Sequence, residues 1–228
     1  MLDPRRDVAP ADGRAHNGDV KLYIATPSPF ARKARIALIE KGVPFETVIE
    51  NPWLPATAMS TVNPLGKVPA LVLDDGTVLH DSSVIVEYLE MLDRAPRLVP
   101  PEGALRVAHR QIEALADGVC DAVVLIVLER AREAAKRSDE WIGRQRRKVE
   151  QGVAGLDRLL GGRETFTPFG FGLAEIAAGC ALGYLDLRLP DYAWRAAAPR
   201  LARWFDALSA RPSFAQTVPT AQAIPPGA

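Results

Sequence analysis

The sequence predicts an α+β protein, in which a small mixed unit of strands and helices precedes a larger all-helical bundle. Residues 20–98 alternate short apolar runs of strand type with amphipathic stretches of helix type. Over most of residues 99–228, by contrast, the apolar residues recur at helical spacing. The proline-broken segment 94–101 lies between the two parts and predicts a linker.

In the first unit, strands are expected at residues 20–25, 43–50, within 63–73 and at 78–79, and helices at 32–42 and 81–89. Gly42 ends the first helix, because glycine adopts the left-handed cap most readily. The Asp-Gly turn at 74–77 joins the last two strands into a hairpin. The order is strand, helix, strand, irregular segment, strand, strand, helix, which is the thioredoxin-like pattern.

The second unit is expected to contain five helices, at residues 102–136, 138–160, 173–187, 199–210 and 212–217. The helix at 173–187 carries many small residues and should therefore be the packed central helix. The tail from Val218 onward is expected to be loose. We see no internal repeat.

Composition excludes several classes of function. The formal net charge is zero, with 28 basic and 28 acidic residues, which argues against a nucleic-acid binder. No apolar stretch reaches the length of a membrane span. Residues 1–19 are polar and predict a disordered extension without a secretory signal, so cytoplasmic residence is expected. Cys120 and Cys180 lie in apolar helical patterns and predict free core thiols, and the three histidines show no metal-ligand spacing.

The junction between the first strand and the first helix is the most informative stretch. Ser28-Pro29-Phe30-Ala31 places a hydroxyl beside the free N–H groups and the positive end of a helix, a position that suits a thiolate or another anion. Serine and alanine stand where a redox protein would have cysteines. Dithiol chemistry is therefore excluded at this junction.

Three motifs in order resemble the glutathione S-transferase N-terminal domain, and in particular the bacterial YibF-type branch. They are S-P-F-x-R-K at 28–33, N-P-L-G-K-V-P-A-L at 63–71 and D-S-S-x-I-x-E-Y-L at 81–89. The resemblance extends over roughly residues 20–218. One departure is Gly172 at the start of the central helix, where many family members have serine or threonine; Glu175 can still complete the cap.

The resemblance implies glutathione as co-substrate and Ser28 as the group that stabilises its thiolate. Each unit by which a thiol pKa falls below ~8.5 needs ~1.4 kcal/mol, so one charge-assisted hydrogen bond of ~1.5–3 kcal/mol has the right size. The alternatives are that Ser28 is a turn or cap serine, or that the nearby Thr26 or a backbone N–H takes its place.

Further glutathione contacts are implied around the cis-proline motif. A cis Val68-Pro69 bond would let the Val68 backbone pair with the cysteinyl part of glutathione, whereas an ordinary trans loop proline would not. Lys67 is expected to meet the glycyl carboxylate, unless it is a solvated loop lysine. Phe30 should help to wall the sulfur site.

The helix start at Asp81-Ser82 suits the γ-glutamyl end of glutathione. Its backbone N–H groups and the Ser82 hydroxyl match the carboxylate, and Asp81 matches the α-ammonium. A plain helix cap is the structural alternative.

The second substrate is expected between the two units, against the first long helix of the bundle. Candidates for its polar wall are Arg106, Arg110, Glu113 and Asp117, although most charged helical residues are merely solvated. Trp53 either lines this cleft or serves as a packing anchor. The acceptor itself cannot be read from these residues.

Three functions remain open on the sequence. The first is a glutathione transferase that attacks an electrophilic small molecule, as in detoxification. The second uses the same thiolate for isomerisation, dehalogenation or ether cleavage, and the third is a non-catalytic glutathione-binding or protein-interaction module. The resemblance also implies a homodimer, with no nucleic-acid or membrane partner and no metal.

Overall fold

The computed structural model describes residues 20–92 and 94–225, so the extension predicted at residues 1–19 lies outside the described part. Its sheet has four short strands: β1 (Lys21–Ile24), β2 (Glu46–Ile49), β3 (Ala70–Val72) and β4 (Val78–Leu79). Their order is β2-β1-β3-β4, with β2 parallel to β1 and the other two neighbouring pairs antiparallel. This is the mixed sheet of a thioredoxin-like domain, as predicted.

Three helices accompany the sheet: α1 (Pro29–Glu40), α2 (Met59–Val62) and α3 (Ser82–Met91). Helix α1 begins earlier than its amphipathic pattern indicated, because proline suits the first helical position and Ser28 caps the free N–H groups. The apolar faces of α1 and α3 close one core against the sheet, and that core also contains Leu173, Ile176 and Cys180 from the second unit. The two units therefore share buried apolar surface.

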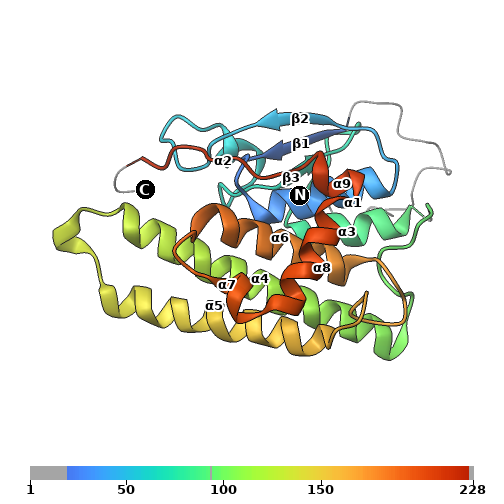
Figure 1. Cartoon of the computed structure of the whole chain (residues 1–228). Coiled ribbons are helices and arrows are strands. Elements are labelled where there is room, and N and C mark those ends of the chain that lie inside the picture. Colours follow the sequence, from blue (N-terminus) through green and yellow to red (C-terminus); the bar gives the residue numbers. More distant parts are fainter. Residues whose placement is uncertain (1–19, 93, 226–228) are drawn as a thin grey trace.

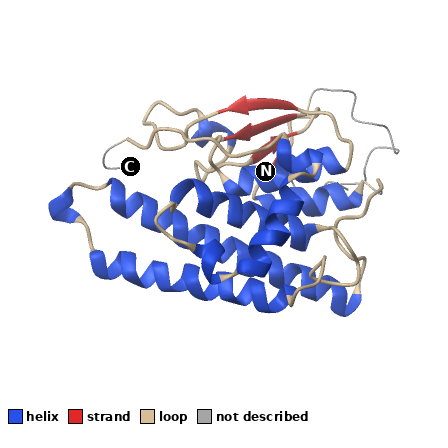
Figure 2. Ribbon diagram, in the orientation of Figure 1, coloured by secondary structure: helices blue, strands red, loops and turns tan. Residues whose placement is uncertain are grey.

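The second unit is helical, as predicted. Its elements are α4 (Gly103–Ala131), a 3₁₀ turn (Ala134–Lys136), α5 (Asp139–Leu160), α6 (Leu173–Arg188), α7 (Trp194–Ala197), α8 (Pro199–Ser209) and α9 (Pro212–Ala215). Figure 2 shows the sheet as a thin layer on one side of a mainly helical molecule. Helix α6 packs against both α1 and α4 and is buried from Leu173 to Leu185, which confirms its central position.

The long helix predicted at residues 102–136 is in fact interrupted. It ends at Ala131, and Arg132 is extended before the 3₁₀ turn. The Glu129 carboxylate accepts hydrogen bonds from the Arg132 guanidinium (3.0 Å) and from the Ser138 backbone N–H (2.8 Å). These bonds draw the chain back toward α4 and start α5, so the helical pattern of 132–136 is overridden.

Glycine at the start of α6 has a steric reason. The Leu173 N–H donates to the Leu98 carbonyl at 2.7 Å, and a Cβ at position 172 would lie 2.4 Å from that oxygen. The Glu175 carboxylate accepts from the Gly172 N–H at 2.9 Å and so completes the helix start. Close approach to the linker therefore explains the departure from the usual capping residue.

The C-terminal tail, which the sequence led us to expect loose, is anchored on the first unit. It has no regular secondary structure but returns past β1 toward α2 (Figure 1). Thr26 and Thr220 exchange two hydrogen bonds, from the Thr26 hydroxyl (3.1 Å) and from the Thr220 N–H (3.4 Å). The Asn51 amide donates to the Ala223 carbonyl at 2.8 Å. Because β1 and β2 are short, polar groups at their ends remain available for this strap, residues 217–225.

Candidate functional site

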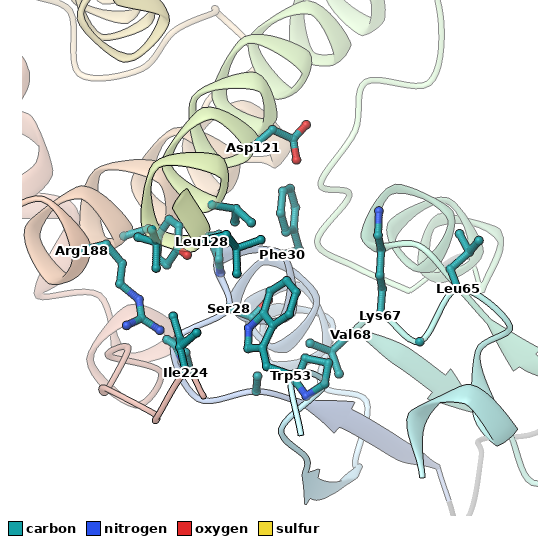
Figure 3. Close-up of a pocket in the computed structure, with 18 residues that line it drawn as sticks. Ser28, Phe30, Trp53, Leu65, Lys67, Val68, Asp121, Leu128, Arg188 and Ile224 are labelled. Carbon is teal, nitrogen blue, oxygen red and sulfur yellow. The ribbon is translucent and has the colours of Figure 1, made fainter. Parts of the chain in front are cut away.

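A cavity of about 360 Å³ opens between the two units, beside the start of α1 (Figure 3). The first unit contributes the junction after β1 and the loops that follow β2 and precede β3. The second unit contributes α4, the end of α6 and the C-terminal strap. The cavity thus exists only where both units and the strap meet.

Ser28 lies in this cavity at the start of α1. Its Oγ accepts a hydrogen bond from the Ala31 N–H at 3.2 Å, and its own N–H donates to the Ala25 carbonyl at 3.0 Å. Within the described residues the Ser28 hydroxyl donates to no acceptor. The cap uses an oxygen lone pair, and the hydroxyl hydrogen stays available for an anion in the cavity.

Thr26, the alternative hydroxyl, is engaged elsewhere. It donates to the Thr220 carbonyl at 3.1 Å and does not line the cavity. A hydroxyl has one hydrogen to donate, so this bond to the strap competes with any role at the sulfur.

The loop before β3 forms one side of the cavity. Lys67 and Val68 line it, as does Phe30 from α1, while Pro69 lies behind Val68 and outside the lining. The Val68-Pro69 bond is cis, as predicted. Asn63 shapes the loop, because its side-chain amide donates to the Lys67 carbonyl at 2.8 Å. No feature of the sequence indicated this role for Asn63 separately, although Asn63 belongs to the second motif.

Asp81 and Ser82 lie outside the lining of this cavity. The Asp81 carboxylate caps α3, accepting from the Ser83 N–H at 3.0 Å and from the Ser83 hydroxyl at 2.8 Å. Partial burial opposes the charge on Asp81, but these hydrogen bonds outweigh it and hold the pKa below its ordinary value. Ser82 is 2% exposed. Contact of either residue with glutathione stays a prediction.

The polar wall predicted on α4 does not line this cavity. Arg106 and Arg110 both form ion pairs with Glu87 of α3, the Arg106 pair at 2.6 Å. Arg110 also pairs with Glu113 at 2.9 Å. These charges hold α4 against the first unit, and contact of the four predicted residues with a second substrate stays a prediction.

Lys33 of α1 completes this charged contact between the units. Its Nζ lies 2.8 Å from Glu113 Oε1 and 2.7 Å from Asp117 Oδ2, with the lysine side chain 1% exposed. Burial favours the neutral amine, but the two carboxylates outweigh it and raise the pKa of Lys33. Burial also raises the pKa of Asp117, and the neighbouring Glu113 carboxylate adds to the rise, so that together they outweigh the opposite effect of Lys33. Sequence reasoning missed Lys33, which stood inside the first motif.

Helix α4 does reach the cavity, but through its next turns. Asp121, Val124, Val127 and Leu128 line the cavity in place of the four predicted residues. Trp53, from the loop after β2, lines it too and is 36% exposed. The lining residues of α4 therefore begin about one turn after Asp117 and about four turns after Arg106.

Three further lining residues were missed. Tyr184 and Arg188 stand one turn apart on α6, and Ile224 belongs to the strap. The arginine at the end of this mainly apolar helix was a signal available in the sequence. For Ile224 there was none, because its position depends on where the strap returns.

Other reactive groups of the described residues are not prepared for catalysis. Burial raises the pKa of the Cys180 thiol to about 12 and that of Cys120 well above its usual value, and both are free, as predicted. Burial lowers the pKa of His109 to about 4. Within 20–92 and 94–225, no three side chains of the metal-binding types gather to hold an ion. Across the same residues, no helix combines the length and apolar character needed to cross a membrane.

Comparison with known proteins agrees with this architecture. Residues 27–92 match the glutathione S-transferase N-terminal domain, and residues 139–207 match the C-terminal domain. The chain is 42% identical to the GST-like protein YibF of Escherichia coli, over 88% of this chain and 98% of that protein. It is 31% identical to a maleylacetoacetate isomerase of Pseudomonas aeruginosa, over 92% of this chain and 100% of that protein.

A solved structure of a glutathione S-transferase from Methylobacterium radiotolerans, in complex with glutathione sulfonate, superposes with a TM-score of 0.87. It is 51% identical, and the match covers 90% of this chain and 97% of that chain. Fold, domain order and sequence identity agree over most of the length. The chain belongs to the glutathione S-transferase family.

Proposed function

We propose that this protein is a glutathione S-transferase in which Ser28 holds the thiol of bound glutathione as the thiolate, ready to attack an electrophilic small molecule. The observation that carries the proposal is the position of Ser28. It lies in the cavity between the units, its oxygen lone pair is used by the helix cap, and its hydroxyl hydrogen is available. Family membership supports glutathione as the ligand.

Glutathione lies with its cysteinyl backbone along Val68, so that its sulfur reaches Ser28. Lys67, on the same side of the cavity, neutralises the glycyl carboxylate, and the γ-glutamyl end extends toward Asp81 and Ser82 at the start of α3. Lys67 and Val68 support this placement because they line the cavity together with Ser28.

The chemistry follows from charge. The Ser28 hydroxyl and the positive end of α1 favour the thiolate over the thiol. One charge-assisted hydrogen bond of ~1.5–3 kcal/mol lowers the thiol pKa by about one to two units. From ~8.5 this brings the thiol pKa to roughly 7. The thiolate sulfur then forms a bond to the electrophilic carbon, and the leaving group departs with its electron pair.

An isomerase reaction on the same thiolate is the second candidate. The 31% identity to a maleylacetoacetate isomerase along the whole of that protein favours it. In an isomerase the sulfur adds to the substrate and leaves again, so glutathione is not consumed. Measuring glutathione before and after turnover separates the two reactions.

We also propose that the protein acts as a homodimer, as the resemblance implied. Exposed apolar side chains on the surfaces of α3 and α4, Val84, Met91 and Val107, support a protein contact there. Sedimentation of the purified chain tests the proposal, and a monomer at micromolar concentration would refute it.

The test of Ser28 has a matched control. Ser138 caps α5 in the same way, accepting the Trp141 N–H at 3.1 Å, but it lies away from the cavity. Both Ser28→Ala and Ser138→Ala should lose about 1 kcal/mol of stability through the cap. We expect Ser28→Ala alone to return the thiol pKa of bound glutathione toward ~8.5, measured by thiolate ultraviolet absorbance against pH.

Two results would contradict the proposal. A thiol pKa that is depressed equally in wild type and in Ser28→Ala would remove Ser28 from the mechanism. Glutathione that binds with its free-solution pKa, or does not bind, would leave the non-catalytic module.

A further inference from the structure

Arg188 is the last residue of α6, and its side chain extends along the wall of the cavity (Figure 3). Its Nε is buried and has no hydrogen-bond partner among the described residues. A buried guanidinium nitrogen without an acceptor costs free energy, whereas one that meets a carboxylate gains a strong charge-assisted bond. A ligand in the cavity cannot reach this buried Nε, so an acceptor from outside the chain meets the terminal amino groups of the guanidinium.

The two carboxylates that flank Arg188 in the sequence are already engaged. Asp186 accepts from the Arg195 guanidinium at 2.8 Å and from the Trp194 ring N–H at 2.7 Å. Asp191 is held by Arg130 at 3.2 Å and by Arg146 at 2.8 Å. Between residues 20–92 and 94–225, Arg188 forms no ion pair. Arg188 lines the cavity, and the partner that it has among these residues is the Tyr184 hydroxyl rather than a carboxylate.

The surroundings of Arg188 in the cavity are apolar. Figure 3 places Leu128 of α4 and Ile224 of the strap on the same side of the cavity as Arg188, and Tyr184 stands one turn before Arg188. The strap holds Ile224 in place through the bond from Asn51 to the neighbouring Ala223 carbonyl, 2.8 Å. A ligand here has an apolar body, enclosed by the strap, and an acidic end.

The other end of the cavity has a different basic residue. Figure 3 shows Lys67 and Arg188 on opposite sides, with Ser28, Phe30 and Trp53 between them. Under the proposed function, Lys67 belongs to glutathione and the sulfur lies at Ser28. The space that remains for the electrophile is the side that ends in Arg188.

We propose that Arg188 is the anion anchor of the acceptor, so that the substrates of this enzyme are apolar electrophiles that carry a carboxylate. This inference rests on the proposed function for the placement of glutathione. The guanidinium fork takes two carboxylate oxygens and orients the substrate with its reactive carbon toward Ser28.

Two glutathione conjugates that differ in one group provide the test. Glutathione thiolate displaces chloride from 4-chloro-3,5-dinitrobenzoate or from the corresponding benzamide; the new S–C bond forms at the ring carbon and chloride leaves with the electron pair. The two purified products have the same ring, and only one carries a charge on it. Their dissociation constants are measured by calorimetry at neutral pH and constant ionic strength, so no turnover is needed.

We expect wild type to bind the carboxylate conjugate about tenfold more tightly than the amide, because a single ion-assisted contact is worth about that factor. Arg188→Gln should abolish the preference and leave amide binding nearly unchanged. Arg188→Lys keeps the positive charge but loses the planar guanidinium that can bind two carboxylate oxygens, so it should retain part of the preference for the carboxylate conjugate. Arg200→Gln, which removes a surface pair with Asp157 outside the cavity, should behave as wild type.

Several outcomes would overturn the assignment. They are equal affinities in wild type, a preference that survives in Arg188→Gln, or failure of both conjugates to bind. If Arg188→Gln weakens both conjugates equally, Arg188 serves glutathione itself or the fold, and the unfolding midpoint decides between these. Lys67→Gln is expected to weaken the binding of both conjugates equally, because both contain the same glutathione part. If wild type prefers the carboxylate conjugate but the thiol pKa of bound glutathione is that of free glutathione, the proposed function of Ser28 is refuted and this inference is not.

Discussion

Replacing Lys33 by methionine is the sharpest test of how the two units are held together. Methionine preserves most of the side-chain length but removes the ammonium that lies 2.8 Å from Glu113 and 2.7 Å from Asp117. Removing one partner of a buried ion pair costs about 3–5 kcal/mol, because the remaining charge is left without compensation. Glu113 keeps its pair with Arg110 at 2.9 Å. We therefore expect the lower end, about 3 kcal/mol.

The loss should depend on pH. Without the ammonium, the folded state binds a proton on the buried Asp117 more readily, so the pKa of Asp117 lies further above that of the unfolded chain. A raised carboxylate pKa means that stability is lost as the pH rises and recovered as it falls. The cost of Lys33→Met should be smaller at pH ~5 than at pH ~8. In wild type the raised pKa of Lys33 means that its contribution is complete below the unfolded pKa of lysine and is lost only in strong base.

Urea unfolding followed by tryptophan fluorescence measures both effects. Lys136 supplies the matched control, because it pairs with Glu133 at a similar 2.9 Å but on the surface, with side chains 62% and 71% exposed. Lys136→Met should cost between 0 and about 1 kcal/mol. A loss below about 1 kcal/mol for Lys33→Met, or the same loss at both pH values, would refute the reasoning.

Two further predictions concern the packing of α6. His109 is buried and has a pKa of about 4, against 6.5 for the free side chain. The folded state should therefore lose at most about 3 kcal/mol of stability as the pH falls through that window, because only the unfolded chain binds the proton. His109→Asn should flatten this dependence in acid titrations, and an unchanged slope would show that other groups dominate. Gly179→Ala would place a Cβ 2.5 Å from Phe214 and 2.6 Å from Leu208, and should cost about 1–3 kcal/mol in urea unfolding. Gly118→Ala, with nothing within 4 Å, should be neutral or stabilising; equal effects would contradict the steric argument.

The sequence by itself determined features that depend on neighbouring residues. The element order of the first unit and the caps of α1 and α3 follow from short motifs, because capping and turn formation involve groups a few residues apart. The cis Val68-Pro69 bond was expected from the family resemblance of its motif. The apolar spacing of α6 likewise identified it as the buried central helix. The position of Ser28 at the strand-to-helix junction belongs to this class.

Only the tertiary structure decided which elements meet. Helical spacing shows that one face of α4 carries charges, but not that Glu87 and Lys33 of the first unit neutralise them and that the cavity begins at Asp121. Arg188 and Ile224 reach the same cavity from a helix end and a returning strap. The spacing of apolar residues indicates that one face of a helix is buried. Which element packs against that face depends on contacts between residues far apart in the chain. The Ser28, Lys67 and Val68 side of the cavity could be anticipated from motifs that resemble the family, and the Arg188 and Ile224 side emerged from the packing of distant segments.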